Sequence, residues 1–323
     1  NLELFLENAH HSFMEVNPVL IKEYKKSTTL RRTKTDSVDC ESIARWLMTV
    51  EYKPHSKGFY HSYSLKSLTR LRDKLVRQRS FYLVKITNVL DHTFPEFKPF
   101  FHERLSKTAL YLLENYGSAE KMARMNSASY EKLRSLSRGK FSPQQFLRLK
   151  ELASNTVGIN NSIFDVELNC LLTLYKSLVK EIGALETEIN KLIEEVHPHY
   201  MSVPGIGPIS AAVIYSEYGD LSNFSTPAQM LAFAGIEPGI NESGTESHGG
   251  RMVKHGSSQL RYVLINCCLP LIRFDMTFAA YYAKKRAEGK PHRVAITHVA
   301  KKLVRVIYAL ERQGTDFNAQ KLR

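Results

Sequence analysis

The sequence has few cysteines and no long apolar segment. Its four cysteines show no Cys-x-x-Cys or zinc-ligand spacing, and four are too few for a disulfide-rich scaffold. Such cysteine usage fits a reducing, cytoplasmic environment. No apolar run reaches the roughly 18 residues that a membrane span requires, because even the stretch Leu264–Ile272 ends at Arg273. We also see no signal-peptide pattern in the first residues, and we expect no membrane partner.

Acidic residues are outnumbered by basic ones. The 323 residues include 45 lysines and arginines against 32 aspartates and glutamates, which gives a net charge of +13. Hydrophobic residues make up 43% of the chain, which excludes a wholly disordered protein and allows two or three domains with buried cores. Because a basic surplus attracts polyanions, the composition indicates a nucleic-acid partner. One group of basic residues lies near the C-terminus: Lys284, Lys285, Arg286, Lys290, Arg293, Lys301, Lys302 and Arg305.

The first residues have the pattern of part of an α/β unit. Apolar residues at helical spacing over 2–9 are followed by a short predicted strand, 12–16. The strands that precede such a helix in an α/β unit are missing, so we expect the chain to be truncated at its N-terminus. Residues 19–35 are strongly basic and favour an exposed loop or a helix followed by a loop, and a further helix begins at Asp36.

Two long helices are predicted in the middle of the chain. The first runs from Leu65 to a stop at Phe94-Pro95, after a connector at 54–64. The second spans about 162–196 and keeps apolar residues in heptad register, which favours a coiled coil: Ile163, Val166, Cys170, Leu174, Leu178, Ile182, Leu185, Ile189, Leu192 and Val196. The two helices pair either as an antiparallel hairpin around the insert 97–160 or between chains, so we expect a helical spacer that dimerises.

The C-terminal third is predicted to be helical around one glycine-rich loop. Residues 203–208 break the second long helix, and helices follow at 210–218 and 228–234. A loop at 235–256 then leads into two more helices, around 257–272 and 291–311.

Asp36 and Asp39 lie three positions apart at the start of a predicted helix, so their carboxylates project from one face about one turn apart. Mg²⁺ prefers carboxylate oxygens and keeps positions open for phosphate, so this pair can supply half of a two-metal site. Aspartate is also common in first turns, where it complements the helix dipole. The spacing alone favours that structural interpretation, whereas the basic stretch just before the pair supports a metal–phosphate site.

Gly205 and Gly207 belong to the motif Pro-Gly-Ile-Gly-Pro, which is followed by small residues of a helix. This order is typical of the hairpin of a helix-hairpin-helix element, whose glycines let backbone N–H groups approach a DNA phosphate. An ordinary turn between packed helices is the alternative. The motif favours contact with the nucleic-acid backbone and carries no sequence readout.

The glycine-rich loop holds Ser243 among three cations, Arg251, Lys254 and Arg261. A serine in such a loop can attack a phosphodiester while the cations stabilise the charge that develops on the phosphate. Composition alone favours an ordinary solvated loop, and it does not separate Ser243 from three competing serines, Ser247, Ser257 and Ser258.

The sequence resembles the DEDD-type transposases of the insertion-sequence 110/1111 group, which are also described as bridge-RNA-guided serine recombinases. The resemblance covers nearly the whole chain in the same order, through the motifs Lys34–Asp39, Pro204–Gly207, Gly235–Pro238, Ser243-Gly244, Lys254–Gly256 and Leu260-Arg261. It implies a multidomain, mostly α-helical protein. Residues 1–62 would form a partial RuvC-like (RNase H-type) α/β domain, 63–198 a helical coiled-coil domain, and 199–323 a transposase domain with a helix-hairpin-helix-like element.

The resemblance also implies an activity, namely DNA strand exchange through a serine-linked intermediate with Mg²⁺, a structured guide RNA and a dimer or tetramer of the chain. Asp36 and Asp39 match the last two acidic residues of the DEDD set, and Ser243 matches the nucleophile. The first two acidic residues would lie upstream of the first residue. On charge and loop position rather than family assignment, Arg251, Lys254 and Arg261 are expected to clamp phosphate. Two other functions stay open: an inactive nucleic-acid-binding remnant of a transposase, and a metal-dependent junction nuclease.

Overall fold

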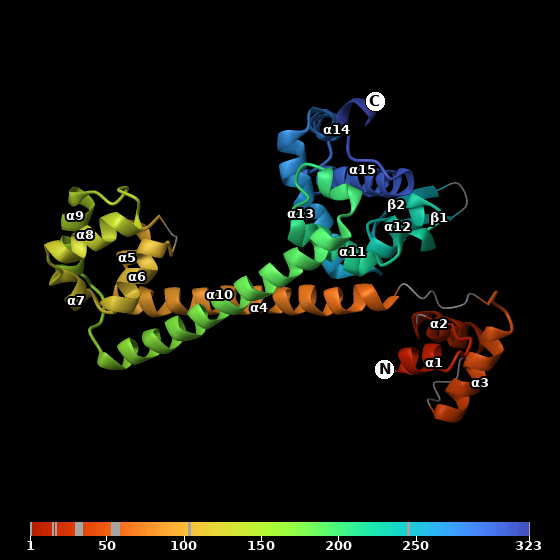
Figure 1. Cartoon of the computed structure of the whole chain (residues 1–323), viewed down its shortest axis with the longest axis horizontal. Helices are drawn as coiled ribbons and strands as arrows, with labels where there is room; N and C mark the ends of the chain where they lie inside the picture. The colour runs from red at the N-terminus through yellow and green to blue at the C-terminus, as the bar shows by residue number, and fades with distance from the viewer. Residues whose placement is uncertain are drawn as a thin grey trace. The chain divides into compact units, whose positions relative to one another are not determined.

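The computed structural model describes residues 2–14, 16, 18–29, 35–52, 59–102, 105–243 and 246–322. The chain divides into two compact units, residues 1–61 and residues 62–323. The described residues of both units are mostly helical (Figure 1). The predicted multidomain, mostly α class is therefore confirmed at this coarse level.

The described residues of the first unit form the helices α1 (Leu2–Asn8), α2 (Pro18–Thr28) and α3 (Asp36–Leu47). The strand predicted at 12–16 is wrong for the described residues of that stretch, which carry no strand. A single strand without a neighbour leaves its backbone N–H and C=O groups unpaired, which removes the reason to form it. No α/β layer is present in the described part of this unit, and the RuvC-like assignment stays a prediction.

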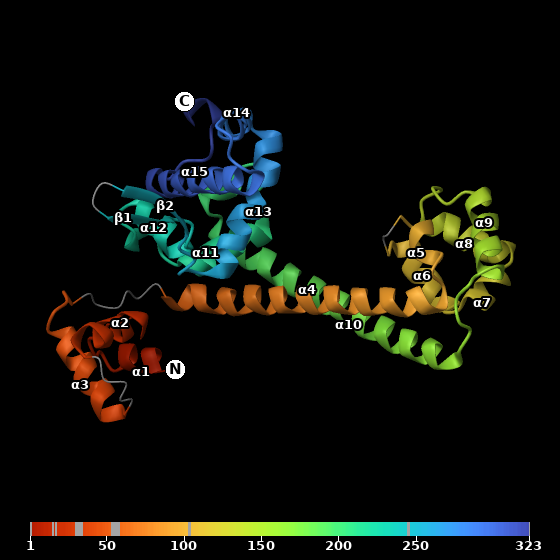
Figure 2. The ribbon, with the colours of Figure 1, turned by 180° about the vertical axis from the view of Figure 1, so that it is seen from behind.

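Two helices of 35 residues each, α4 (Phe59–Thr93) and α10 (Ser162–Val196), run antiparallel in the second unit (Figure 1 and Figure 2). Arg72 of α4 donates from Nε and Nη2 to Oε1 of Glu186 on α10, at 2.9 and 2.5 Å. The helix α4 begins inside the predicted connector, whereas its end before Phe94-Pro95 and both ends of α10 agree with the sequence prediction. Asn161 caps α10, since its side chain accepts a hydrogen bond from Ile163 N.

The heptad positions predicted on α10 are not buried within the chain over its first half, where pairing between chains stays a prediction. Ile163 and Val166 are 71% and 70% exposed, while Leu168 and Leu172 are buried. The reason is nonlocal, because Leu168 and Leu172 face a separate core that the insert between the long helices supplies. Further along α10, Ile182 and Ile189 are buried as predicted.

The described residues of that insert form short helices with their own apolar core. They are α5 (Phe97–Phe100), α6 (Lys107–Asn115), α7 (Ala119–Ala123), α8 (Ser127–Leu136) and α9 (Pro143–Ser154). Serine or asparagine side chains cap α6, α7, α8 and α9. The core joins Phe94, Phe97 and Leu112 to Leu168 and Leu172, so it closes one end of the α4–α10 pair.

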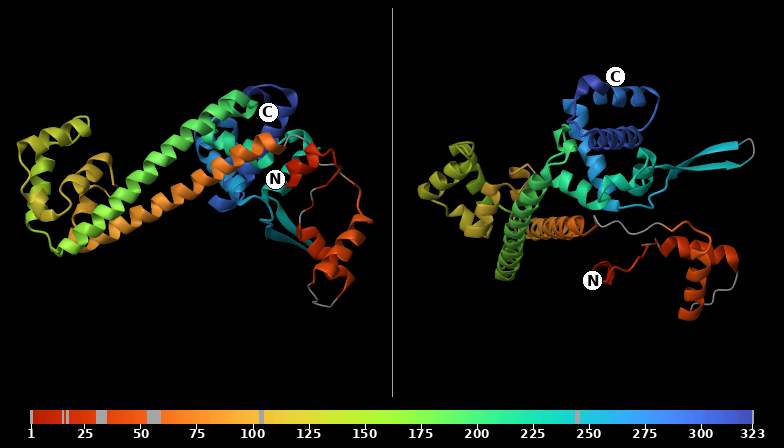
Figure 3. Two further views of the ribbon diagram at one scale, coloured as in Figure 1. Left: turned by 60° about the horizontal axis from the view of Figure 1, so that its bottom comes forward. Right: turned by 45° about the vertical axis from the view of Figure 1, so that its right-hand side comes forward.

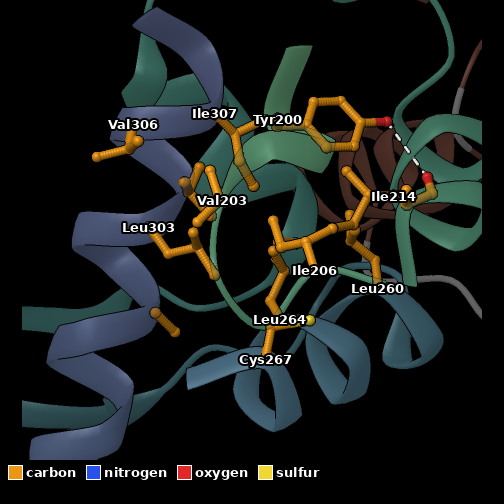
Figure 4. Close-up of a cluster of buried hydrophobic side chains, with 14 of the residues drawn as sticks. Tyr200, Val203, Ile206, Ile214, Leu260, Leu264, Cys267, Leu303, Val306 and Ile307 are labelled. Carbon is orange, nitrogen blue, oxygen red and sulfur yellow. Dashed lines mark hydrogen bonds between the residues drawn. The ribbon is translucent and has the colours of Figure 1, made fainter. Parts of the chain in front are cut away.

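The other end of the pair packs into a second core, which is built mainly from the C-terminal helices. These are α11 (Pro208–Tyr218), α12 (Pro227–Ala234), α13 (Ser258–Phe274), α14 (Met276–Ala287) and α15 (His292–Gln313), with short 3-10 turns η1 (His199–Ser202), η2 (Leu221–Asn223) and η3 (Ala319–Leu322). Figure 4 shows Tyr200, Ile214, Leu264 and Leu303 converging in this core, which also contains Leu65 of α4. The sequence reading missed α14, although Asp275 caps it by accepting from Phe278 N.

The glycine-rich segment expected to be a loop forms a β-hairpin. Strand β1 (Pro238–Ser243) pairs antiparallel with β2 (Glu246–Met252), and the register shifts between Pro238 and Ile240. The two strands project from the helices as a ribbon (Figure 3). Strand pairing satisfies backbone N–H and C=O groups that an extended loop would leave to water. This is why a segment that leaves the core and returns to it often closes as a hairpin.

Among the described residues, no single helix is long and apolar enough to cross a membrane. The helices α13 and α14 pass the length and composition test only when taken together, and the chain bends by 107° between them.

Candidate catalytic residues and nucleic-acid interface

Asp36 and Asp39 lie in the first turn of α3, as the sequence predicted. Thr35 caps the helix by accepting a hydrogen bond from Val38 N at 3.4 Å. Asp36 is exposed, and Asp39 is half-buried and paired with Lys25 of α2 through an Nζ–Oδ1 distance of 2.5 Å. The ion pair ties α2 to α3, so Asp39 has a structural role in addition to the one predicted for it.

The Mg²⁺ site predicted at the aspartate pair stays a prediction. Among the described residues, no group of three or more His, Cys, Asp or Glu side chains is placed to hold a metal ion. Mg²⁺ is often bound by one or two protein carboxylates together with waters and substrate phosphates. Two carboxylates on one helix face fit that pattern, provided that Asp39 exchanges the Lys25 ammonium for the ion.

The turn at Gly205 and Gly207 gives its two glycines different roles. Gly205 has φ +96°, and a Cβ there would lie 2.9 Å from both Cys267 O and Pro270 Cγ of α13. Gly205 is therefore required for close packing of the turn on α13. Gly207 is exposed, has nothing within 4 Å of a built Cβ, and precedes the first turn of α11. Contact with a DNA phosphate stays a prediction, and of the two glycines only Gly207 is open to it.

The turn is also fixed from its other side by Tyr200. This buried side chain donates its hydroxyl hydrogen to Ala211 O at 3.2 Å (Figure 4). The bond connects η1 with the first turns of α11, so the backbone of the turn is held from both of its flanking helical segments.

Ser243 is the last residue of β1 and pairs with Glu246. Its side chain and that of Arg251 in β2 lie outside the described side chains, so only their backbone positions enter the description. Ser257 instead caps α13 by accepting from Leu260 N at 3.2 Å, and Ser258 is the first residue of that helix. Of the four serines that composition could not separate, Ser243 and Ser247 are thus the two that lie on the hairpin.

The hairpin leaves the core through a neck made by two glycines. A Cβ on Gly256 would lie 2.0 Å from Phe233 O and 2.7 Å from Gly235 N, and a Cβ on Gly235 would lie 3.0 Å from Gly256 N. Such distances are impossible for any side chain, so the two backbones touch directly. A bond from Val253 N to Glu237 O, 2.9 Å long, continues the contact toward the strands.

The cations predicted to clamp phosphate differ in their surroundings. Lys254 is exposed and has φ +56° just beyond β2. Arg261 on α13 is half-buried and donates from Nη1 to Ala234 O at 3.2 Å, so one of its N–H groups satisfies the C-terminal end of α12. A Cβ on Gly235 would lie 2.7 Å from the same Nη1, which places Arg261 against the neck.

Glu217 is a buried carboxylate that the sequence analysis did not single out. Its Oε1 and Oε2 accept from Arg70 Nε at 2.8 Å and Nη2 at 3.1 Å, and Lys66 Nζ lies 3.5 Å from Oε2. Burial alone would raise the pKa of Glu217, but the hydrogen bonds from Arg70 and Ser257 and the charge of Lys66 outweigh it and lower the pKa below its ordinary value. A single glutamate within the apolar helix 208–218 was the signal available in the sequence.

These contacts link three parts of the second unit. Arg70 belongs to α4, Glu217 to α11, and Ser257 is the N-cap of α13, directly after the neck. The carboxylate therefore joins the long helix to the residue at which the hairpin segment returns to the core.

Two family models match the chain. One, described as a transposase and of the DEDD type found in IS110, matches residues 1–95, and the other, described as "Transposase IS116/IS110/IS902 family", matches residues 198–283. The 43.6 kDa protein of insertion element IS110 from Streptomyces coelicolor is 28% identical over 89% of this chain and 73% of its own length.

Two further relatives align over most of the chain. The transposase for insertion sequence element IS1111A from Coxiella burnetii is 26% identical over 80% of this chain and 59% of its own length. The 42 kDa protein of insertion element IS900 from Mycobacterium paratuberculosis is 27% identical over 88% of this chain and 73% of its own length. With transposase models of one group matching both ends in order, the chain belongs to the IS110/IS116 family of insertion-sequence transposases.

Proposed function

We propose that this protein carries out DNA strand exchange for an insertion sequence, with Ser243 as the nucleophile and a structured RNA as the guide. The proposal is supported by the family of the chain and by the position of Ser243 at the end of β1, on a hairpin anchored to the core by the Gly235–Gly256 neck. In this proposal residues 1–62 form the RuvC-like domain, 63–198 the helical coiled-coil domain and 199–323 the transposase domain, as the sequence predicts.

In this mechanism the Ser243 hydroxyl oxygen attacks a DNA phosphorus. A serine–phosphate bond forms, the bond from phosphorus to one DNA oxygen breaks, and that DNA end leaves as a hydroxyl after taking up a proton. The serine proton passes to solvent or a nearby base. Because one phosphoester replaces another, a second DNA hydroxyl can later reverse the step and rejoin strands without an external energy source.

The remaining residues have supporting roles. Asp36 and Asp39 would hold Mg²⁺, which when bound would neutralise phosphate charge. Lys254 is placed beside the neck with its ammonium exposed, where it can contact the DNA backbone, and Arg251 and Arg261 are the other proposed clamps. Arg261 would serve with the N–H groups that Ala234 O does not use.

A homo-oligomer is part of the same proposal. One face of α10 exposes Ile163, Val166 and Leu174, and α4 exposes Phe81 and Val84. Apolar side chains repeated along a helix face are typical of an interface between helices of two chains. Light scattering of the protein with RNA and DNA tests this part, and a monomer at micromolar concentration would contradict it.

A covalent-adduct assay tests the chemistry. The protein is mixed with Mg²⁺, RNA from the flanks of the element and labelled DNA of the element ends, then denatured and examined for label on protein. We expect an adduct that needs the RNA, disappears in Ser243→Ala and persists in Ser247→Ala, the matched serine of β2.

Other results point to other functions. An adduct lost only in Ser247→Ala would move the nucleophile to β2. Mg²⁺-dependent nicking without an adduct would indicate a junction nuclease, and binding without either reaction would indicate an inactive remnant. An adduct that forms equally without RNA would overturn the guided part of the proposal alone.

A further inference from the structure

A cavity of about 510 Å³ lies between α14, α15 and the segment that follows α15. Its volume falls within the range of about 300–1,000 Å³ that is typical of small-molecule sites. None of the residues assigned to strand exchange above lines it. Its lining is contributed by Tyr281, Lys302, Arg305, Val306, Ala309, Leu310, Gln313, Thr315, Asp316, Phe317 and Asn318.

The cavity combines a cationic side with an apolar one. Lys302 Nζ lies 5.1 Å from the centre of the Phe278 ring and 5.2 Å from that of Tyr281, so its charge rests on aromatic faces. Arg305, one helical turn further along α15, is exposed and has no ion pair with another described residue. The apolar part of the lining includes Leu310, which belongs to the core of the C-terminal helices, and Phe317, which packs against that core.

The wall formed by residues 315–318 is anchored. Asp316 Oδ1 lies 3.0 Å from His199 Nδ1, and Phe317 N donates to Ser202 Oγ at 2.8 Å. Thr315 N donates to Leu310 O at 3.3 Å, which closes the end of α15. Asp316, the one acidic residue of the lining, is thus held by the imidazole of His199 at the edge of the wall.

We propose that this cavity binds one unpaired nucleotide of a nucleic-acid strand, with the base between Tyr281 and Phe317 and the phosphate at Lys302 and Arg305. Aromatic rings and apolar side chains accept the face of any base, while cations neutralise the phosphate. Gln313 and Asn318 offer amide groups to the base edge. A base paired within a duplex cannot enter such a cavity unless it leaves the stack, so the site selects single-stranded or extruded nucleotides.

This inference rests on the proposed function only in requiring that the protein binds nucleic acid. It adds a site for a single nucleotide away from Ser243 and from the aspartate pair. Unpaired nucleotides arise in a folded RNA and in a DNA strand opened for exchange. The test therefore uses both RNA and DNA probes.

Fluorescence anisotropy with short oligothymidine, oligouridine and duplex probes tests the site. Tyr281→Leu removes one ring, and Ala309→Phe fills the cavity while keeping every charge. Tyr262→Leu, at an exposed ring of α13, is the matched control. We expect the first two variants to weaken single-strand binding roughly 5- to 100-fold, the range of base–aromatic stacking, while duplex binding and the control stay near wild type.

An abasic nucleotide in the probe identifies the group that is bound. If the base enters the cavity, a strand of abasic residues binds wild type and Ala309→Phe equally. The oligothymidine and oligouridine probes then report whether DNA, RNA or both use the site. Thermal melts of each variant exclude unfolding as the cause.

The opposite results are distinguishable. Unchanged single-strand binding in Ala309→Phe and Tyr281→Leu, with duplex binding and the Ser243 adduct intact, would overturn the nucleotide site alone. Equal losses for single strands and duplex in folded variants would also overturn it, because they would indicate a general backbone surface. Failure of the wild-type protein to bind any probe would overturn this site and the proposed function together.

Discussion

The bond between Arg70 and Glu217 offers a direct test of how the long helix α4 is fastened to the C-terminal core. The Glu217 side chain is 1% exposed, whereas that of Arg70 is 49% exposed. Both carboxylate oxygens accept from one guanidinium, at 2.8 and 3.1 Å. Replacing Arg70 by Met keeps an unbranched side chain close to the length of the apolar part of Arg70 and removes both hydrogen bonds.

The expected cost follows from the asymmetry of burial. Removing one partner of a fully buried ion pair typically costs about 3–5 kcal/mol, because the other charge is left without compensation. Lys66 and Ser257 remain beside Glu217 after the change, and half of the Arg70 side chain is already in water. We therefore expect Arg70→Met to lower the free energy of unfolding by about 2 kcal/mol.

A double-mutant cycle with Glu217→Gln isolates the pair. Denaturation in urea is measured for the wild type, both single variants and the double variant, and we expect a coupling energy of about 1–2 kcal/mol. Arg77→Met is the matched control, since Arg77 is 71% exposed and pairs with Asp73 one turn away on the same helix. Such exposed pairs contribute about 0.5 kcal/mol or less. Equal losses for Arg70→Met and Arg77→Met, or a coupling energy below about 0.5 kcal/mol, would refute the reasoning.

Three other outcomes are expected. Gly205→Ala should destabilise the protein by about 2 kcal/mol in urea unfolding because φ is +96° and Cys267 O lies in the way. Gly207→Ala should cost less than about 1 kcal/mol, the loss expected when alanine replaces glycine at the N-cap of α11; equal effects would contradict the assigned packing. Gly256→Ala should abolish the serine adduct by forcing the neck apart, since its Cβ would lie 2.0 Å from a carbonyl oxygen, and an active variant would show that the neck is not needed. Because the pKa of Glu217 is lowered in the folded state, its stabilisation is complete above the unfolded pKa of about 4.3 and is lost as pH falls through the folded value. Urea unfolding between pH 7 and pH 3 should therefore show a steeper acid loss in wild type than in Glu217→Gln, and parallel curves would contradict this.

The sequence specified the long helices better than the faces they bury. Both ends of α10 could be read from local signals, namely Asn161 before it and Pro198 after it. Local signals say nothing about which of several apolar stripes finds a partner. The apolar stripe through Ile163 and Val166 fits a heptad pattern as well as the stripe through Leu168 and Leu172 does. Only the second stripe is buried, because it packs against the core of the insert. Burial on a helix rich in apolar residues is thus set by tertiary contacts.

The glycine-rich segment shows the opposite limitation. Its composition predicts flexibility, and it lacks the alternation of apolar residues that marks a strand. Gly235 and Gly256 were read only as parts of a loop motif, whereas the structure makes them the two backbones of a contact too close for any side chain. Such a contact cannot be predicted from the sequence, because the residues around either glycine do not indicate which distant residue it packs against.

The choice among the four serines depends on this same geometry. Ser257 already uses its side-chain oxygen to cap α13, by accepting a hydrogen bond from Leu260 N. Ser258 is the first residue of α13 and therefore does not lie on the hairpin. An attacking hydroxyl must instead be free to reach a phosphorus atom, a requirement that favours a residue carried away from the core. By backbone position, Ser243 and Ser247 are the two serines on the hairpin, and the family resemblance favours Ser243. The Ser243→Ala and Ser247→Ala pair is therefore the informative comparison, because both changes fall on one ribbon and only the chemistry separates them.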